Sequence, residues 1–132
     1  MKVWIGGELE KEIHENYRII RNQIEKSLNA YIKEIGYNNE QIKKLRVVFI
    51  LRNDSFSVMK EKEGKVGKDR GEPIYGVNLR LDYNEFKNGD ENIRKKMIYE
   101  GLLKAFSLVE EQRKIKNLDT IKEYIKNKIE YL

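Results

Sequence analysis

The run LRVVFIL at positions 45–51, which is apolar at every position except Arg46, is the sequence feature that most restricts how this chain folds. Its β-branched and aromatic residues favour extended backbone, and so continuous a run is typical of a central strand covered on both faces. The run is far shorter than the roughly 20 apolar residues that a membrane-spanning helix needs. We therefore expect a buried strand at 45–51, with the rest of the domain packed around it.

Two further segments have the character of strands. Residues 2–6, KVWIG, form a short β-rich run that the glycines at 6 and 7 end. Residues 74–83 alternate, which predicts a half-buried strand that pairs antiparallel with 45–52. A further strand at 56–62 is an alternative that the sequence leaves undecided. The apolar face of 74–83 would carry Val77, Leu79, Leu81 and Tyr83, and its polar face Asn78, Arg80 and Asp82.

Helical periodicity fills the other long segments, about 11–35, 91–113 and 118–131. Gly36 is placed to end the first helix and Asn117 to begin the last. Strands 2–6 and 45–51 would run parallel through a right-handed crossover. The order β-α-β-β-α-α predicts an α+β fold, with a small mixed or antiparallel sheet and helices packed on one face. The apolar positions of the first helix are Ile13, Tyr17, Ile20, Ile24, Leu28, Tyr31 and Ile35.

Length and composition predict one domain, 1–132. Cysteine is absent, which excludes disulfides, thiolate metal sites and thiol nucleophiles and fits a reducing compartment. The first residues lack the pattern of a signal peptide, so we expect a cytoplasmic protein without a membrane partner. Residues 60–72, KEKEGKVGKDRGE, are rich in glycine and charge and predict a mobile charged loop.

Residues able to carry chemistry are scattered along the chain. His14 is the single histidine, so a two-histidine metal site is excluded. The glycine pair at 6–7 precedes a helix but lacks both phosphate-binding fingerprints. We expect no catalytic residue, metal or cofactor, and a hydrolase is the least favoured alternative. Attraction to the helix dipole explains the acidic residues at the first helix start, which are Glu8, Glu10, Glu12 and Glu15.

The balance of 27 basic against 22 acidic side chains leaves a net charge of +5. A basic balance can indicate nucleic acid, so a small RNA-binding or RNA-associated module stays as an alternative function. On the first helix, one arc beside the apolar stripe holds His14, Arg18, Arg21 and Glu25. They would either grip a phosphate or acidic partner or seal the edge of the core, and we favour sealing.

Trp4 is the only tryptophan and stands between Val3 and Ile5 in the first strand. We expect its side chain to fill the core and to anchor the first helix. If its face of the sheet were open, Trp4 would instead be a hot spot for binding a partner.

Three short stretches, MKVWIGGE, YRIIRNQIEK and LRLDYNEF, resemble the immunity protein 44 family, small bacterial proteins of polymorphic-toxin and contact-dependent inhibition systems. The resemblance implies a protein that performs no chemistry and binds a cognate toxin domain, often a nuclease, to block its active site or a neighbouring surface. We expect most motif positions to serve the fold. The matching positions are Trp4, Gly7, Glu8, Arg18, Arg21, Glu25, Asp82, Tyr83 and Phe86.

Two sets of charged residues are candidates for contact with a toxin, and both alternatives stay open. An acidic set would complement a basic nuclease despite the net positive charge of the chain. A basic set in the charged loop would complement an acidic toxin surface. The acidic set is Glu8, Glu10, Glu12 and Glu15, and the basic set is Lys65, Lys68 and Arg70.

Overall fold

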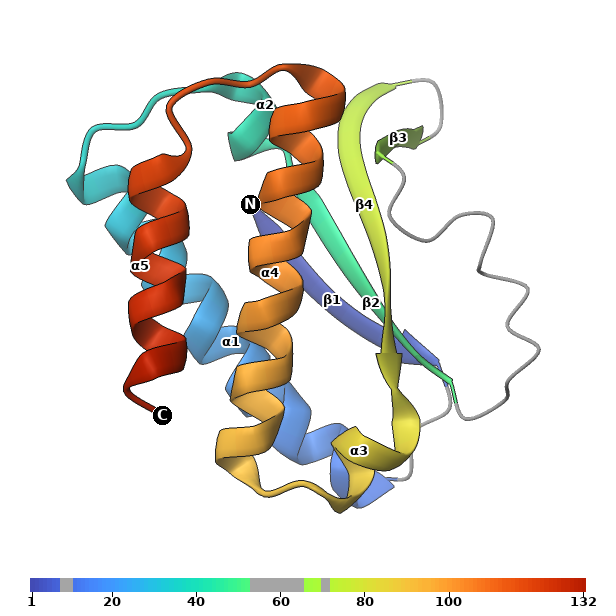
Figure 1. Ribbon diagram of the computed structural model, residues 1–132. Helices are drawn as coiled ribbons and strands as arrows, with labels where there is room; N and C mark the ends of the chain where they lie inside the picture. The colour runs from blue at the N-terminus through green and yellow to red at the C-terminus, as the bar shows by residue number, and fades with distance from the viewer. Residues whose placement is uncertain (8–10, 53–65, 70–71) are drawn as a thin grey trace.

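A computed structural model describes residues 1–7, 11–52, 66–69 and 72–132 (Figure 1). The helices and strands are β1 (Lys2–Gly7), α1 (Lys11–Glu34), α2 (Glu40–Lys43), β2 (Arg46–Arg52), β3 (Val66–Asp69), β4 (Glu72–Asp82), α3 (Tyr83–Asn88), α4 (Glu91–Arg113) and α5 (Asp119–Glu130). The strands form one sheet in the order β1-β2-β4-β3. The α+β class and the mixed sheet are therefore confirmed.

Strand β2 lies in the middle of the sheet, as its apolar run predicted. It pairs parallel with β1 on one side and parallel with β4 on the other. The antiparallel pairing expected between 45–52 and 74–83 is wrong. A hairpin would turn the chain back at once, whereas residues 53–71 exceed the dozen or so residues that a parallel return needs. The antiparallel neighbour of β4 is β3.

The segment 60–72 is not a loop throughout. Val66–Asp69 form β3, and Glu72 begins β4. The rest of this segment, 60–65 and 70–71, lies outside the described residues, as does the strand considered at 56–62.

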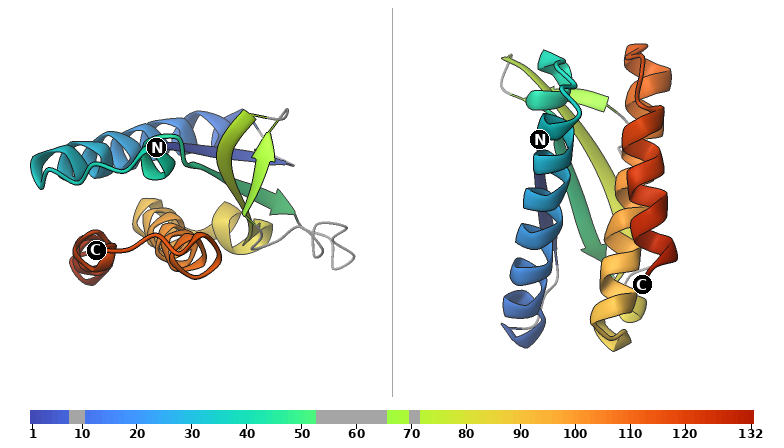
Figure 2. Two further views of the ribbon diagram at one scale, coloured as in Figure 1. Left: turned by 90° about the horizontal axis from the view of Figure 1, so that it is seen from above. Right: turned by 90° about the vertical axis from the view of Figure 1, so that its left-hand side faces the viewer.

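The core lies between one face of the sheet and the helices. Phe49 of β2 is fully buried, and Gly101 of α4 packs directly on its ring. A Cβ at position 101 would overlap that ring, so α4 approaches β2 this closely because residue 101 is glycine. The ring of Tyr31 on α1 stacks on Tyr124 of α5, with centroids 4.2 Å apart. Viewed from above, α1 lies across from α4 and α5, and β4 lies to the side of these helices (Figure 2).

The helix ends follow local signals in one case and tertiary packing in another. Gly36 ends α1 with a φ of +69°, and its N–H donates to the Lys33 carbonyl as predicted for a glycine cap. Asn117 is not the N-cap of α5, because Leu118 occupies that position without a side-chain cap bond. The Leu118 side chain is fully buried, so the core decides which residue stands there.

Candidate protein-binding surface

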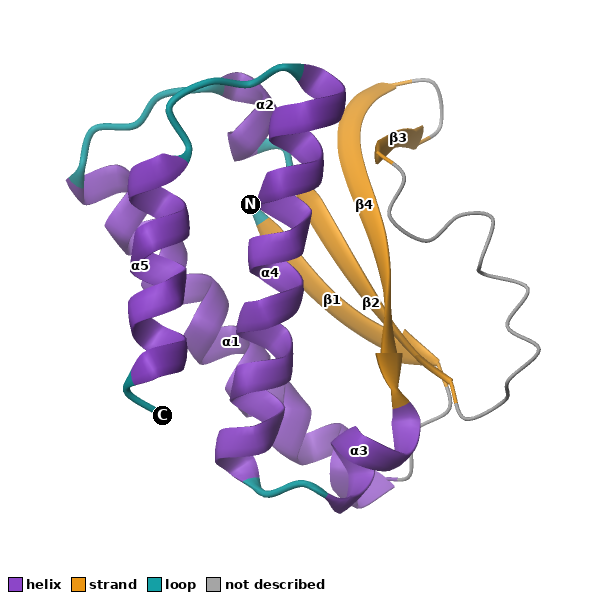
Figure 3. Ribbon diagram, viewed as in Figure 1, coloured by secondary structure: helices purple, strands orange, loops and turns teal. Residues whose placement is uncertain are grey.

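The helices gather on one side of the strands, as Figure 3 shows. Strand residues whose side chains point to that side are buried, and their neighbours in sequence point the other way. No helix of the described ranges packs over this second surface, which we call the open face. The open face comprises Lys2, Trp4 and Gly6 of β1, Arg46, Val48 and Ile50 of β2, and Gly76, Asn78, Arg80 and Asp82 of β4.

Trp4 belongs to the open face. Its side chain is 46% exposed, whereas Val3 and Ile5 are 0% and 6% exposed. The prediction that Trp4 fills the core is therefore wrong, because alternation along the strand points Val3 and Ile5 at the helices and Trp4 away from them. An exposed tryptophan is typical of a binding hot spot.

The prediction that both faces of β2 are covered is also wrong for the described residues. Val48 and Ile50 are only partly buried, while Val47 is fully buried. The strand is central in the sheet, but helices of the described ranges cover one of its faces alone (Figure 3). Its apolar residues on the other face, together with Trp4, form a continuous apolar centre, because Trp4 stands opposite Val48 in the pairing register.

Side chains of α1 form hydrogen bonds with backbone groups along the outer edge of β1. Arg21 Nη1 donates to the Val3 carbonyl at 2.8 Å, and the Val3 N–H donates to Glu25 Oε2 at 3.0 Å. Asn29 Nδ2 donates to the Met1 carbonyl at 3.0 Å. These three helix residues follow one another at intervals of four, so they lie along one side of α1. Arg21 and Glu25 thus cap an edge strand whose backbone would otherwise be a template for aggregation.

Arg21 also contacts Trp4. Its guanidinium carbon lies 5.5 Å from the centre of the Trp4 rings, a cation–π geometry. The Nε of Arg21 is buried and has no hydrogen-bond partner among the described residues. One side chain therefore binds the backbone of β1 and restrains the indole of the following residue. Arg18, three residues earlier, is exposed.

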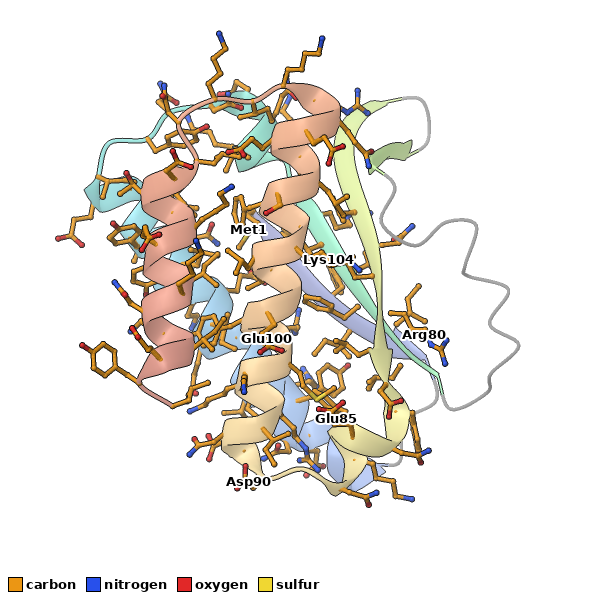
Figure 4. The ribbon with its side chains drawn as sticks, in the orientation of Figure 1. Met1, Arg80, Glu85, Asp90, Glu100 and Lys104 are labelled. Atoms are coloured by element: carbon orange, nitrogen blue, oxygen red, sulfur yellow. The ribbon has the colours of Figure 1, made fainter. Side chains whose placement is uncertain are left out.

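Positive charge predominates on the open face. Lys2 is exposed, and Arg46 and Arg80 are partly buried and each make a further interaction within the chain. Figure 4 shows Arg80 pointing away from the helices. The one acidic side chain of the set, Asp82, lies at the end of β4 and accepts a hydrogen bond from the Glu85 N–H at 2.8 Å, which caps α3.

Three further motif positions, Gly7, Tyr83 and Phe86, have backbone or packing constraints in the structure. Gly7 has a φ of +109°, and a Cβ there would overlap the Leu51 carbonyl oxygen, so only glycine fits. Tyr83 and Phe86 are buried. Arg94 of α4 holds this region by donating from Nε to the Phe86 carbonyl at 2.8 Å.

The charged residues predicted to contact a toxin are mostly untested by the structure. Glu15 is exposed on α1, Glu12 belongs to α1 and Lys68 belongs to β3. The other predicted contact residues lie outside the described ranges, and they are Glu8, Glu10, Lys65 and Arg70. The residues that sequence reasoning missed are the cations and aliphatic side chains of the open face.

A hollow of about 430 Å³ lies beside the N-terminal residue, between the end of α1 and α2. Its lining includes Ile32, Tyr37 and Ile42 with several asparagines and lysines, but neither a carboxylate nor a histidine. The amino group of Met1 donates to the Lys43 carbonyl at 3.0 Å, and burial lowers the pKa of that amine. The lining thus lacks the residue types that most often serve as general acid or base.

The part of the chain that the structure describes contains no group of three or more histidine, cysteine, aspartate or glutamate side chains able to hold a metal ion. Of the helices in that part, none combines the length and the apolar character that crossing a bilayer requires.

The sequence profile of the family described as immunity protein 44 matches residues 1–131. No curated protein and no solved structure matches the chain at a significant level. Because the match covers nearly the whole chain, the protein belongs to the immunity protein 44 family, which confirms the resemblance of its three motifs. The family implies an inhibitor that acts on a protein partner.

Proposed function

We propose that this protein is a cytoplasmic immunity protein of a polymorphic-toxin or contact-dependent inhibition system. It binds a cognate toxin domain, such as a nuclease, and neutralises it by covering its functional surface. Membership of the immunity protein 44 family supports the proposal. The structural observation that carries it is Trp4, which is 46% exposed on a sheet face that no helix of the described residues covers and is restrained by Arg21.

Inhibition of this kind requires an interface and no bond-making groups. A stable one-to-one complex usually buries about 1,600 Å² in total. Large side chains that are already held in place lose little conformational entropy on binding, so they contribute more of their contact energy to affinity. Trp4 meets this condition because Arg21 contacts both its ring and the carbonyl of Val3.

Of the two charged sets, the basic one agrees better with the open face. Lys68 belongs to β3, which pairs with β4 at the edge of the sheet. A toxin surface that contacts the cations of the open face can extend toward this edge. The acidic set remains the choice for a basic toxin, with Glu15 exposed on α1.

The proposal is tested by expressing the toxin domain encoded beside this gene, with and without the protein. We expect growth to be restored by co-expression and the purified pair to elute together in equal amounts. A toxin domain of an unrelated system serves as the control and should not be neutralised. Undiminished killing together with separate elution of the cognate pair would refute the proposal.

A further inference from the structure

We infer that the open face is the surface that binds the toxin, and that it docks on an acidic region of the toxin domain with Trp4 as its central anchor. This inference rests on the proposed function and adds to it the binding surface and the chemistry of the partner.

The pairing register places the apolar residues of the open face between cations. Trp4, Val48 and Asn78 stand opposite one another across three strands. The next row toward the amino ends of the strands holds Lys2, Arg46 and Gly76, and the next toward the carboxyl ends holds Gly6, Ile50 and Arg80. An apolar centre with arginines around it has the composition of a protein interface, where tryptophan and arginine contribute most of the binding energy.

The charges of the open face indicate the kind of surface that binds it. Of the open-face residues, Lys2, Arg46 and Arg80 are cationic and Asp82 alone is acidic, and Asp82 is used to cap α3. Arg46 and Arg80 make interactions within the chain, but a guanidinium has five N–H donors and can bind a carboxylate in addition. The complementary surface is therefore one that presents carboxylates around an apolar pocket for the indole.

A protein partner fits this face better than single-stranded RNA. Proteins that bind single strands stack successive bases on several aromatic side chains. Among the described side chains of the open face, Trp4 is the one aromatic, and Arg21 already contacts its ring. The neighbouring positions hold aliphatic Val48 and Ile50, which suit the apolar centre of a protein interface.

Gly6 offers a way to block the face without disturbing the fold. It lies next to Trp4 on the same side of β1, and a Cβ at this position would meet no atom within 4 Å. A large side chain at position 6 would therefore project into open space. Gly6→Tyr should leave the stability unchanged or higher, because tyrosine favours strands more than glycine does, while it obstructs any partner seated over Trp4.

The first experiment measures Kd for the cognate toxin domain by calorimetry. We expect Trp4→Ala and Gly6→Tyr each to weaken binding by about 30-fold, the size of a hot-spot loss. The double variant Arg46→Glu/Arg80→Glu should weaken it similarly and slow association most at low ionic strength. Ile19→Ala and Lys26→Glu are matched controls on α1, where Ile19 is 58% exposed, and should change Kd by less than about twofold. Thermal unfolding shows that each variant is folded.

The second experiment observes Trp4 directly, first in the wild-type sequence and then in one variant. Trp4 is the single tryptophan, so 5-fluorotryptophan places one ¹⁹F nucleus in the protein and none in an unlabelled toxin. We expect its resonance to shift on complex formation and to lose its sensitivity to exchange of H₂O for D₂O. In free Arg21→Lys the resonance should broaden or move, because the planar guanidinium that restrains the indole is gone.

The outcomes separate this inference from the proposed function. If the wild type binds and neutralises the toxin while the open-face variants bind as tightly, or while the α1 controls lose binding instead, the open face is not the interface and the function stands. If the wild type neither binds nor neutralises the toxin, the function fails and the inference fails with it. Binding of a mixed-sequence single-stranded RNA that depends on Trp4, without toxin binding, would overturn both.

Discussion

The two faces of the sheet are built from alternate residues of the same strands and differ in what lies against them. On the helix-covered face, Val47, Phe49 and Leu51 are at most 1% exposed. On the open face, Val48 and Ile50 are partly buried and Trp4 is 46% exposed. Residues of similar hydrophobicity thus have different environments, because the helices in the described part of the chain pack on one side of the sheet (Figure 3).

This difference has an energetic consequence. Complete burial of a large apolar side chain stabilises a fold by about 1.5–3 kcal/mol, whereas a half-exposed one contributes less. The packing of the fold therefore explains the apolar residues of the open face less well than those of the helix-covered face. Exposed apolar patches of this kind mark interaction sites. The predictions below test whether the covered face carries stability and the open face does not.

The largest effect is expected from Phe49→Ala on the covered face. The ring is fully buried and packs against Gly101, so its removal should lower the free energy of unfolding by about 3–5 kcal/mol. Urea denaturation measures the change, with Val48→Ala as the control from the next position along the same strand. A loss below about 1 kcal/mol for Phe49→Ala would contradict the assignment of Phe49 to a tightly packed core.

A second substitution tests how closely α4 approaches the sheet. Gly101→Ala should lower stability by about 1–3 kcal/mol through overlap with the Phe49 ring, despite the higher helix propensity of alanine. In the Phe49→Leu background the same change should cost much less, because the smaller side chain leaves room. Equal effects in both backgrounds, measured as a double-mutant cycle, would show that the two residues do not touch.

At the edge of the sheet, Glu25→Ala removes the acceptor of the Val3 N–H and should cost about 1–3 kcal/mol. Hydrogen exchange of the Val3 amide should accelerate in this variant. Glu25→Gln keeps an acceptor oxygen and should retain most of the protection, while Lys26→Ala, at the next and exposed position, serves as the control. Unchanged exchange at Val3 in Glu25→Ala would mean that the edge is capped by another group.

In the helical layer, burial, together with a smaller effect of the nearby Tyr124, raises the pKa of Tyr99 to about 12. An unfolded chain releases this proton near pH 10, so between about pH 10 and 12 the unfolded state binds fewer protons than the folded state. Stability should therefore fall as pH rises through this window, by at most about 1.4 kcal/mol per pH unit. Below about pH 10 both states keep the proton, and Tyr99 adds no pH dependence.

The variant Tyr99→Phe isolates this effect. Its stability should decline less steeply than that of the wild type above pH 10, and the difference between the two proteins should be constant at lower pH. Parallel declines of the two proteins above pH 10 would show that Tyr99 is not the group responsible.

The smallest change in stability is expected on the open face. Val48→Thr and Ile50→Thr keep branched strand-forming side chains at partly buried positions and should each alter the free energy of unfolding by roughly 0.5 kcal/mol. Urea denaturation beside Val47→Thr gives the direct contrast, since Val47 is fully buried. If all three substitutions were equally destabilising, the distinction between the two faces would not hold.

Much of the fold was predictable because its signals are local. The interval of apolar residues located α4 at its observed bounds, Glu91–Arg113, and Gly36 marked the end of α1. The helix α3 was missed, although Asp82 followed three residues later by Glu85 has the spacing of a capping box. Its brevity, and the strand pattern that runs into Tyr83, concealed it.

The candidate site was less predictable. Sequence reasoning singled out Trp4 but favoured the core for it, and it did not group Val48, Ile50 or Arg46 with it. In an apolar run such as 45–51, alternation shows that neighbours point to opposite faces but not which set meets the helices. The pairing of β1, β2 and β4 brings these residues together, and that pairing joins segments far apart in the chain.

By itself the sequence determined the three long helices, most strands, the mixed α+β class and the family, because each follows from residues near one another along the chain or from short motifs. Only the tertiary structure decided that β4 runs parallel to β2 and that the helices cover one face of the sheet. That choice set Trp4 on the outside. The physical reason is that a strand presents two faces of nearly equal hydrophobicity here, and long-range packing selects which of them is buried.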